Sequence, residues 1–247
     1  MPMQAKHGTL NVHRADCDRK HANPCDPWPV RLPRLVKFLS TRMRCSTYSF
    51  QECLPAQASD ITTLLGWGSH KNPGFWGDEN FNVIAADRKK WTDLQVAEVS
   101  LLLKVGDKGD TNRRSANWVQ LRHLDSGRDV WFGSGHFENG DPAARRVQAG
   151  RYVATKPQGP VVAGLDKNSF SGSAGDPRDI LTRGGFREVA VATQERSFHG
   201  FAKPVLDGKC IDSLHVTGGV KVRFGEFHST AGLGATDHSG LAVGWSL

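Results

Sequence analysis

Short apolar runs alternate along this chain with amphipathic stretches, and several of the runs end in a polar side chain. The clearest run is Val161-Val162-Ala163-Gly164-Leu165, which leads directly into Asp166 and, two residues later, Asn168. In a β-strand, successive side chains point to opposite faces, so Asp166 and Asn168 would leave the end of the strand on the same side. Taken alone, this stretch is more typical of a strand followed by an Asp/Asn turn than of a functional site.

Helical spacing of apolar residues occurs in a few segments between the apolar runs. The longest of these has Arg and Lys between its apolar positions, and Pro33 is compatible with a helix there only in the first turn. Asp141 and Pro142 form a typical N-cap and first helical position. The predicted helices cover residues 28–44, 61–65 and 141–154, with a short one at 180–185.

The remaining apolar or β-rich runs predict strands, two of them joined as a hairpin across Asp125-Ser126-Gly127. A Gly/Trp/Asn/Pro-rich segment at 66–79 is predicted to be a loop. Because strand–helix–strand units alternate with hairpins, we expect an α/β protein with a mixed sheet and helices outside it, as one domain over residues 1–247. The predicted strands are 9–12, 48–50, 80–86, 99–103, 116–124, 128–136, 161–166, 189–192, 210–216, 220–224 and 241–245.

The composition is that of a globular protein in water, with 38% hydrophobic and 23% charged residues. No apolar run approaches the ~20 residues that a membrane-spanning helix needs. The first ten residues lack the apolar segment of a secretory signal, and five cysteines, an odd number, do not suggest a disulfide framework. We therefore expect no membrane span and, by default, a cytoplasmic protein with reduced thiols.

The chain is basic, with 32 Lys and Arg against 25 Asp and Glu, a net charge of +7 and a pI near 9.3. Such a charge favours association with a polyanion, either nucleic acid or an anionic lipid headgroup. It says nothing about the fold.

One polar segment near the N-terminus has a regular pattern of possible metal ligands, because His13, Cys17, His21 and Cys25 are each separated by four residues. These residues could form a zinc site of two His and two Cys, or Cys17 and Cys25 could form a disulfide. The uniform spacing differs from the paired-ligand zinc motifs. The favoured interpretation is that the segment has no special role.

Polar residues at the ends of predicted strands form a more informative pattern. α/β sheets place their functional sites at strand ends, although any one such residue is more often a cap or a turn residue. The residues are Asn11, Glu52, His136, Asp166, Asn168, Asp212, Asp237 and His238.

In this order, the residues resemble the motifs of the endonuclease/exonuclease/phosphatase superfamily, which has the deoxyribonuclease I-like fold. Phe50-Gln51-Glu52 matches the Gln-Glu motif, Ile211-Asp212-Ser213-Leu214 resembles Ile-Asp-Tyr-Ile, and Thr236-Asp237-His238 resembles Ser-Asp-His. The resemblance extends from Leu10 to Val243. Two positions depart from the family pattern: Leu165 stands where a glycine is usual, and Gly135 replaces the usual threonine before His136.

The resemblance implies a four-layer α/β/β/α sandwich, with two mixed sheets packed face to face, and a Mg²⁺-dependent phosphoesterase for which Mn²⁺ is a substitute. Glu52 would be the main metal ligand, with Asn11 and Asp237 nearby. His238, oriented by Asp212, would activate or position the attacking water, and Asp166 would share that role. Asn168 and His136 would hold the phosphate.

Additional basic side chains are candidates for phosphate contacts, and a solvated charged face explains them equally well. They are Arg113, Arg114, Arg145 and Arg146. Of these, Arg114 and Arg145 are the predicted substrate-binding residues.

Three functional hypotheses follow. The first is a monomeric nuclease that cleaves phosphodiester bonds of DNA or RNA, which the basic charge favours. The second is a phosphatase or phosphodiesterase for a small or lipid phosphate, such as a phosphoinositide or sphingomyelin. The third is a non-catalytic nucleic-acid-binding protein of the same fold, which the complete set of polar residues disfavours.

Overall fold

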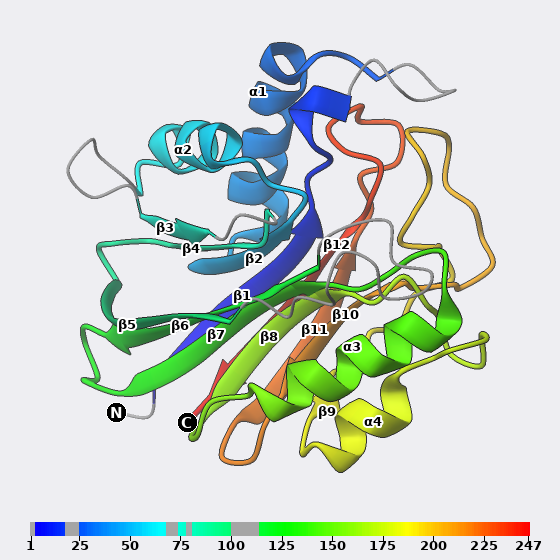
Figure 1. The fold of residues 1–247 in the computed structure, drawn as a ribbon. Coiled ribbons are helices and arrows are strands. Elements are labelled where there is room, and N and C mark those ends of the chain that lie inside the picture. Colours follow the sequence, from blue (N-terminus) through cyan, green and yellow to red (C-terminus); the bar gives the residue numbers. More distant parts are fainter. Residues whose placement is uncertain (1–2, 18–24, 68–73, 78–80, 100–113) are drawn as a thin grey trace.

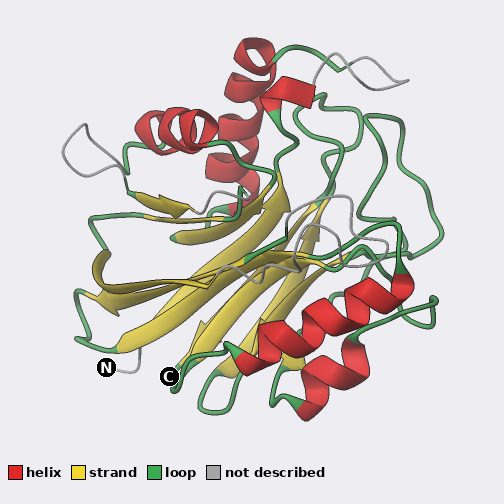
Figure 2. Cartoon of the chain, viewed as in Figure 1, coloured by secondary structure: helices red, strands yellow, loops and turns green. Residues whose placement is uncertain are grey.

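The computed structural model describes residues 3–17, 25–67, 74–77, 81–99 and 114–247, with only the backbone described for residues 97–99. Its centre is a pair of six-stranded sheets, in the orders β11-β12-β1-β2-β4-β3 and β5-β6-β7-β8-β10-β9. The sheets are mixed, because β1 pairs with β2, and β7 with β8, in parallel, whereas their other neighbours are antiparallel. Helices α1 and α2 lie on one side of the sheets, and α3 and α4 on the other (Figure 1). The predicted four-layer sandwich is confirmed, and Figure 2 shows the strands in yellow between the red helices.

The first sheet contains β1 (Gln4–Asn11), β2 (Thr47–Gln51), β3 (Phe75–Gly77), β4 (Val83–Ala86), β11 (Lys221–His228) and β12 (Gly240–Ser246). The second contains β5 (Trp91–Val99), β6 (Ala116–His123), β7 (Asp129–His136), β8 (Val161–Asp166), β9 (Arg187–Glu188) and β10 (Asp212–Val216). The helices are α1 (Trp28–Phe38), α2 (Pro55–Leu64), α3 (Pro142–Ala154) and α4 (Arg178–Arg183). None of the described helices has the length and apolarity to cross a membrane.

The helix predictions are close to the structure where a local signal marks the helix boundary. Asp141 caps α3, as its carboxylate accepts hydrogen bonds from the backbone N–H groups of Ala143 and Ala144. The predicted helix at 61–65 is the end of α2, which begins earlier, at Pro55. A proline in the first turn is a start signal that the apolar spacing alone does not reveal.

Several strand predictions are wrong in position. Strand β3 lies within the segment predicted to be a loop, and residues 189–192 are not a strand, because β9 ends at Glu188. Strand β5 comes before the predicted strand at 99–103, whose residues 100–103 lie outside the described residues. The zinc alternative for the segment 13–25 involves His21, which also lies outside them, and Cys17 and Cys25 form no disulfide with each other. Edge strands such as β3 and β9 are short, so their periodicity is weak.

Side-chain alternation on β8 determines which residues face the interior between the sheets. Leu165 packs with α3 and α4, whereas Gly164 faces β1 and β2 of the other sheet. A Cβ atom on Gly164 would lie 2.3 Å from Thr9 Oγ1, so only glycine permits the sheets to approach this closely. By the same alternation, Asp166 at the end of β8 points into the space between the sheets.

Polar side chains join the two sheets directly behind the strand ends. Gln51 Nε2 donates to Ser134 Oγ at 3.0 Å and to the Gly164 carbonyl at 3.3 Å, and Ser49 Oγ donates to the Gly133 carbonyl at 2.6 Å. All of these groups are buried, where a satisfied hydrogen bond is strong and has a defined geometry. The bonds hold the ends of β2, β7 and β8 in a defined register.

Candidate active site

The polar residues singled out in the sequence converge at one edge of the sandwich. Asn11 ends β1, His136 ends β7 and Asp166 ends β8. Asp212 begins the antiparallel strand β10, so it pairs directly with Asp166. Opposed residues of paired strands point to the same face of a sheet, which places these two carboxylates side by side.

His238 and Asp212 form the most tightly defined pair of the site. Nδ1 of His238 lies 2.9 Å from Oδ2 of Asp212, and both side chains are buried. Nε2 of His238 lies 3.9 Å from Oδ2 of Asp166. Burial opposes protonation of His238, but the charge and hydrogen bond of Asp212, with the charges of Asp166 and Asp237, raise its pKa well above the usual value. The surroundings of His238 therefore favour its protonated, imidazolium form.

Asp166 is the carboxylate whose protonation is most affected by its surroundings. Burial, together with the nearby charge of Asp212, raises the pKa of Asp166 to about 7. The carboxylate is oriented by two hydrogen bonds: Asn11 Nδ2 donates to Oδ2 at 3.1 Å, and Asn168 N donates to Oδ1 at 3.0 Å. A carboxyl group of this pKa exchanges a proton easily near neutral pH.

Asn168, which is partly exposed, and His136, which is buried, form a second pair. Asn168 Nδ2 donates to the Phe137 carbonyl at 2.9 Å and lies 2.8 Å from His136 Nε2, which acts as the acceptor. His136 is therefore neutral, with its proton on Nδ1 as assigned from this network. Burial and the charges of Arg114 and His238 keep the pKa of His136 well below the usual value.

Glu52 follows β2, and in a regular strand its side chain would face away from that of Gln51. Glu52 instead has φ 52°, in the left-handed region that residues other than glycine seldom adopt. Its carboxylate accepts a hydrogen bond from Asn11 Nδ2 at 3.0 Å. The change in backbone direction thus brings Glu52 to Asn11, which connects it to Asp166.

Asp237 lies next to His238 in a turn that precedes β12. Its Oδ2 lies 3.4 Å from Nδ1 of His13, and Thr236 Oγ1 donates to the Asn11 carbonyl at 2.7 Å. Burial opposes ionisation of Asp237, but the contact with His13 and the charge of His238 lower its pKa to about 2. Asp237 and His238 can both face the site although they are adjacent in the chain, because they occupy a turn, where the alternation of side chains along a strand does not apply.

Comparison with known proteins places this geometry among known folds. No family model matches the chain, and no curated protein sequence matches it. Solved structures do match over nearly the whole chain. An endonuclease/exonuclease/phosphatase from Bacteroides vulgatus has a TM-score of 0.79 and 19% identity, with 99% of each chain covered. The chain has the endonuclease/exonuclease/phosphatase fold.

Two further structures of this fold have more specific names. A mannosyl-6-phosphatase from Bacteroides thetaiotaomicron has a TM-score of 0.76 and 15% identity, covering 98% of this chain and 100% of its own. The D. rerio protein TDP2, complexed with a single-strand DNA product, has a TM-score of 0.70 and 13% identity, with 99% of each chain covered. At these identities the likeness establishes the fold alone.

The arginines expected to bind phosphate differ in their placement within this fold. Arg145 is buried, and its nitrogens donate to the carbonyls of Glu138, Asn139 and Ala174 at 2.8, 3.1 and 3.0 Å. This geometry supports a role in holding the loop after β7, in contrast to the phosphate contact expected from the sequence. Arg146 lies outside the site, in an ion pair with Asp179, and Arg113 lies outside the described residues.

Arg114 does lie beside the site. It is buried, its Nε is 3.7 Å from Glu138 Oε2, and its charge contributes to the lowered pKa of His136. Asn11 also differs from the expectation of a metal ligand. Its Oδ1 accepts the backbone N–H of His13 at 3.0 Å, so its Nδ2, a donor, faces the carboxylates.

Sequence reasoning missed two residues of the site. His13 contacts Asp237, as described, and was considered only for zinc. Phe198 pairs with His238 in an isolated β-bridge, and its ring lies 5.0 Å from the His238 imidazole while the residue is 40% exposed. The sequence near Phe198 has no motif that marks it, because its position depends on a long loop folding back onto the turn before β12.

The donor atoms of the site fit a divalent cation. Negative charge is in excess at the site, because His238 is the cation that contacts its carboxylates. In addition, Oδ1 of Asp212 has no hydrogen-bond partner among the described residues. Carboxylate oxygens in this excess are the ligands that Mg²⁺ and Mn²⁺ prefer. The carboxylates belong to Glu52, Asp166, Asp212 and Asp237.

Two positions within this group could hold the cation. Asp166, Asp212 and His238 have ligand atoms within 4.8 Å of one another. However, the hydrogen bond between Asp212 and His238 already uses the facing atoms of that pair. Glu52 has no cationic hydrogen-bond partner among the described residues, and its side chain is 30% exposed, so the Glu52 side is the more accessible position.

Proposed function

We propose that this protein is a divalent-metal-dependent phosphoesterase that hydrolyses phosphodiester bonds of nucleic acid. The observation that carries the proposal is the buried arrangement of Asp166 beside the hydrogen-bonded pair of Asp212 and His238. It combines a carboxyl group whose pKa is near neutral with a buried imidazolium. A proton acceptor next to a fixed positive charge suits the attack of water on a phosphate.

In the proposed reaction, each of these residues has a separate role. Asp166, in its ionised form, accepts a proton from the attacking water through Oδ2. His238 donates from Nε2 to a non-bridging phosphate oxygen, and Asp212 holds its ring through Nδ1. The P–O bond to the leaving group breaks, and the leaving oxygen takes a proton from solvent while Asp166 releases its proton to solvent, so that the products are a phosphate monoester and an alcohol.

The phosphate in this scheme is positioned by the neutral side chains of Asn168 and His136 and by the positive charge of Arg114. Asn168 holds His136 with its proton on Nδ1, so the ring orientation is determined before substrate binds. Arg114 lies close enough to influence the pKa of His136 and adds positive charge to the site. Preorganised donors of this kind stabilise the charge that develops on the phosphate oxygens.

Glu52, with Asp237 nearby, would hold Mg²⁺ or Mn²⁺. When bound, the cation would neutralise charge on the phosphate or on the leaving oxygen. Asn11 would orient the Glu52 carboxylate through its Nδ2, and the left-handed backbone at Glu52 directs that carboxylate into the site.

Two observations favour nucleic acid as the substrate. The net charge of +7 attracts a polyanion. Phe198 presents a partly exposed ring next to His238, where it can stack on a base beside the scissile phosphate. The single-strand DNA product in the TDP2 complex is consistent with such a substrate on this fold.

The proposal is tested by incubating purified protein with supercoiled plasmid DNA and with single-stranded RNA in Mg²⁺ or Mn²⁺. We expect cleavage that EDTA abolishes. His238→Ala should remove the activity, whereas His228→Ala, at a side chain that contacts Glu226 and the ring of Phe38, should retain it. Protein that is inert on DNA, RNA and bis-nitrophenyl phosphate with either metal would contradict the enzyme assignment.

A small phosphate monoester is the second candidate, which the likeness to a mannosyl-6-phosphatase supports. Phe198→Ala distinguishes the two. Removal of a stacking ring should raise the KM for single-stranded DNA by roughly tenfold, because base–aromatic stacking contributes about 1–3 kcal/mol. The same change should leave hydrolysis of a sugar phosphate or a phosphoinositide nearly unaltered. A panel of these substrates with abasic DNA identifies the preferred class.

A further inference from the structure

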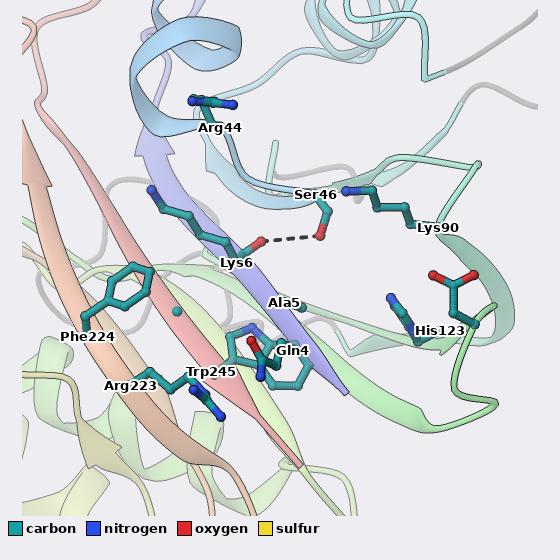
Figure 3. A pocket seen from close by; sticks show the side chains of 12 residues that line it. Gln4, Ala5, Lys6, Arg44, Ser46, Lys90, His123, Arg223, Phe224 and Trp245 are labelled. Carbon is teal, nitrogen blue, oxygen red and sulfur yellow. Dashed lines mark hydrogen bonds between the residues drawn. The ribbon is translucent and has the colours of Figure 1, made fainter. Parts of the chain in front are cut away.

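A second polar pocket lies at the opposite end of the sandwich from the candidate active site. Its volume is ≈ 400 Å³, within the range of pockets that bind small molecules. It is bounded by the first residues of β1, the end of β12 and the start of β11, with the turns before β2 and β5. The lining side chains that carry the argument are Lys6, Arg44, Lys90, Arg223, Phe224 and Trp245 (Figure 3).

The lining is strongly cationic. Lys6 is bound by Glu226, but no ion pair of the described residues engages Arg44, Lys90 or Arg223. Figure 3 shows these three side chains on different sides of the pocket, and they belong to separate segments of the chain. Asp125 is the carboxylate of the lining, so positive charge remains in excess. Cations gathered from separate segments around one cavity are suited to a compact anion.

Two aromatic residues complete the lining. Trp245 is fully buried, and its Nε1–H has no hydrogen-bond partner among the described residues. The ring packs in the core between the sheets, with its centroid 6.3 Å from that of Trp91 and 6.1 Å from that of Phe132, so Trp245 contributes a rigid floor to the pocket. The ring of Phe224 lies against Gly244, where a Cβ would be 2.3 Å from the ring, and the residue is 45% exposed. This leaves a flat apolar wall beside the cations.

The pocket is separate from the candidate active site. Strand β1 runs from Gln4, in the pocket lining, to Asn11, in the site. At ~3.3 Å per residue the two ends are roughly 23 Å apart. A phosphate held in the active site does not reach this pocket.

We propose that this pocket is a second binding site, for a small phosphorylated molecule. The phosphate oxygens accept from Arg44, Lys90 and Arg223. The apolar wall formed by Phe224 accommodates the part of the ligand that is not charged. The proposal does not depend on the reaction performed at the other end of the molecule.

The test is calorimetric titration of the full chain with inorganic pyrophosphate in EDTA, where no hydrolysis occurs. Lys90→Ala with Arg223→Ala should weaken binding at one site roughly tenfold or more, because two charge-assisted contacts are removed. The chain offers a matched control in the neighbouring exposed cations Lys89 and Lys221, which do not line the pocket. The variant Lys89→Ala with Lys221→Ala has the same net charge as the Lys90/Arg223 variant and should bind pyrophosphate as tightly as the wild type does.

Adenosine monophosphate and adenosine extend the same titration. We expect the nucleotide to bind in the pocket and adenosine to bind more weakly by at least about tenfold, since the phosphate supplies the charged contacts. An affinity unchanged in the Lys90/Arg223 variant, or lowered equally in both variants, would overturn the proposal.

Two further readouts keep the result interpretable. Lys90→Gln with Arg223→Gln repeats the test with longer side chains, and the melting temperature reports folding of each variant. Cleavage of plasmid DNA should be the same in the pocket variants and the controls, because the altered residues lie far from Asp166 and His238. A loss of pyrophosphate binding with intact cleavage therefore separates this proposal from the proposed function.

Discussion

Asp212 and His238 are 26 residues apart in the chain, yet the Asp212 carboxylate holds the His238 ring through Nδ1 at 2.9 Å. The contact keeps an imidazolium buried, because Asp212 opposes the effect of burial on the pKa of His238. Asp212→Asn retains the shape of the side chain but removes its charge. We expect kcat to fall by roughly 10²–10⁴-fold, the range for loss of an acid–base group, with a smaller change in KM.

Steady-state kinetics on a phosphodiester substrate measures this effect. Asp129→Asn is the matched control, because Asp129 forms an exposed ion pair with Arg122 on the hairpin and lies away from the site. Equal activity of the two variants would show that the pair of Asp212 and His238 does not act in the reaction.

Glu52 combines an unfavourable backbone conformation with a functional carboxylate. Glu52→Gly should raise the free energy of unfolding by about 1 kcal/mol, because glycine adopts positive φ without a steric penalty. The same change should abolish metal-dependent activity. Glu52→Gln should also lose activity but show no such stabilisation. Urea denaturation in EDTA measures the stability, and a Glu52→Gly variant less stable than Glu52→Gln would contradict the strain argument.

Gly164 and Gly150 respond oppositely to the same substitution. Gly164→Ala inserts a Cβ 2.3 Å from Thr9 Oγ1, between the two sheets, and should destabilise the fold by about 3 kcal/mol. Gly150 lies within α3 with no atom within 4 Å of the added Cβ, so Gly150→Ala should stabilise by about 0.5–1 kcal/mol. Thermal unfolding of both variants checks the signs.

His7 and His215 make the fold sensitive to acid. Both are buried, and burial lowers the pKa of each from 6.5 to about 3. The unfolded chain therefore binds protons below pH 6.5 that the folded chain does not. The resulting stability is fully present above pH 6.5 and is lost progressively as the pH falls toward 3.

Two such histidines give a slope of about 2.7 kcal/mol per pH unit in the steep part of this range. Urea denaturation between pH 7 and pH 4 measures the slope, and His215→Gln should reduce it by about half of that amount. A free energy of unfolding that does not change between these pH values would refute the prediction.

Local sequence patterns were sufficient to predict an element where its own segment contains the signal for it. Asp141-Pro142 marks the start of α3, and the apolar run from Val161 predicts β8 and its terminal Asp166. The order of the strand-end residues also led to the fold, and the structural comparison confirms it. Strands β3 and β9 were misplaced because they are too short to show a period and depend on pairing with a neighbour.

Contacts between distant segments decided the remaining features. Arg145 resembles a phosphate-binding residue in sequence, but the fold surrounds it with backbone carbonyls. Phe198 reaches His238, and Lys90 and Arg223 line one pocket, only because separate segments fold together. Residue type and spacing determine which side chains leave a strand end and on which side. Burial, pairing and charge, which exist only after the sheets pack, determine which of them are protonated, which are accessible and which are structural.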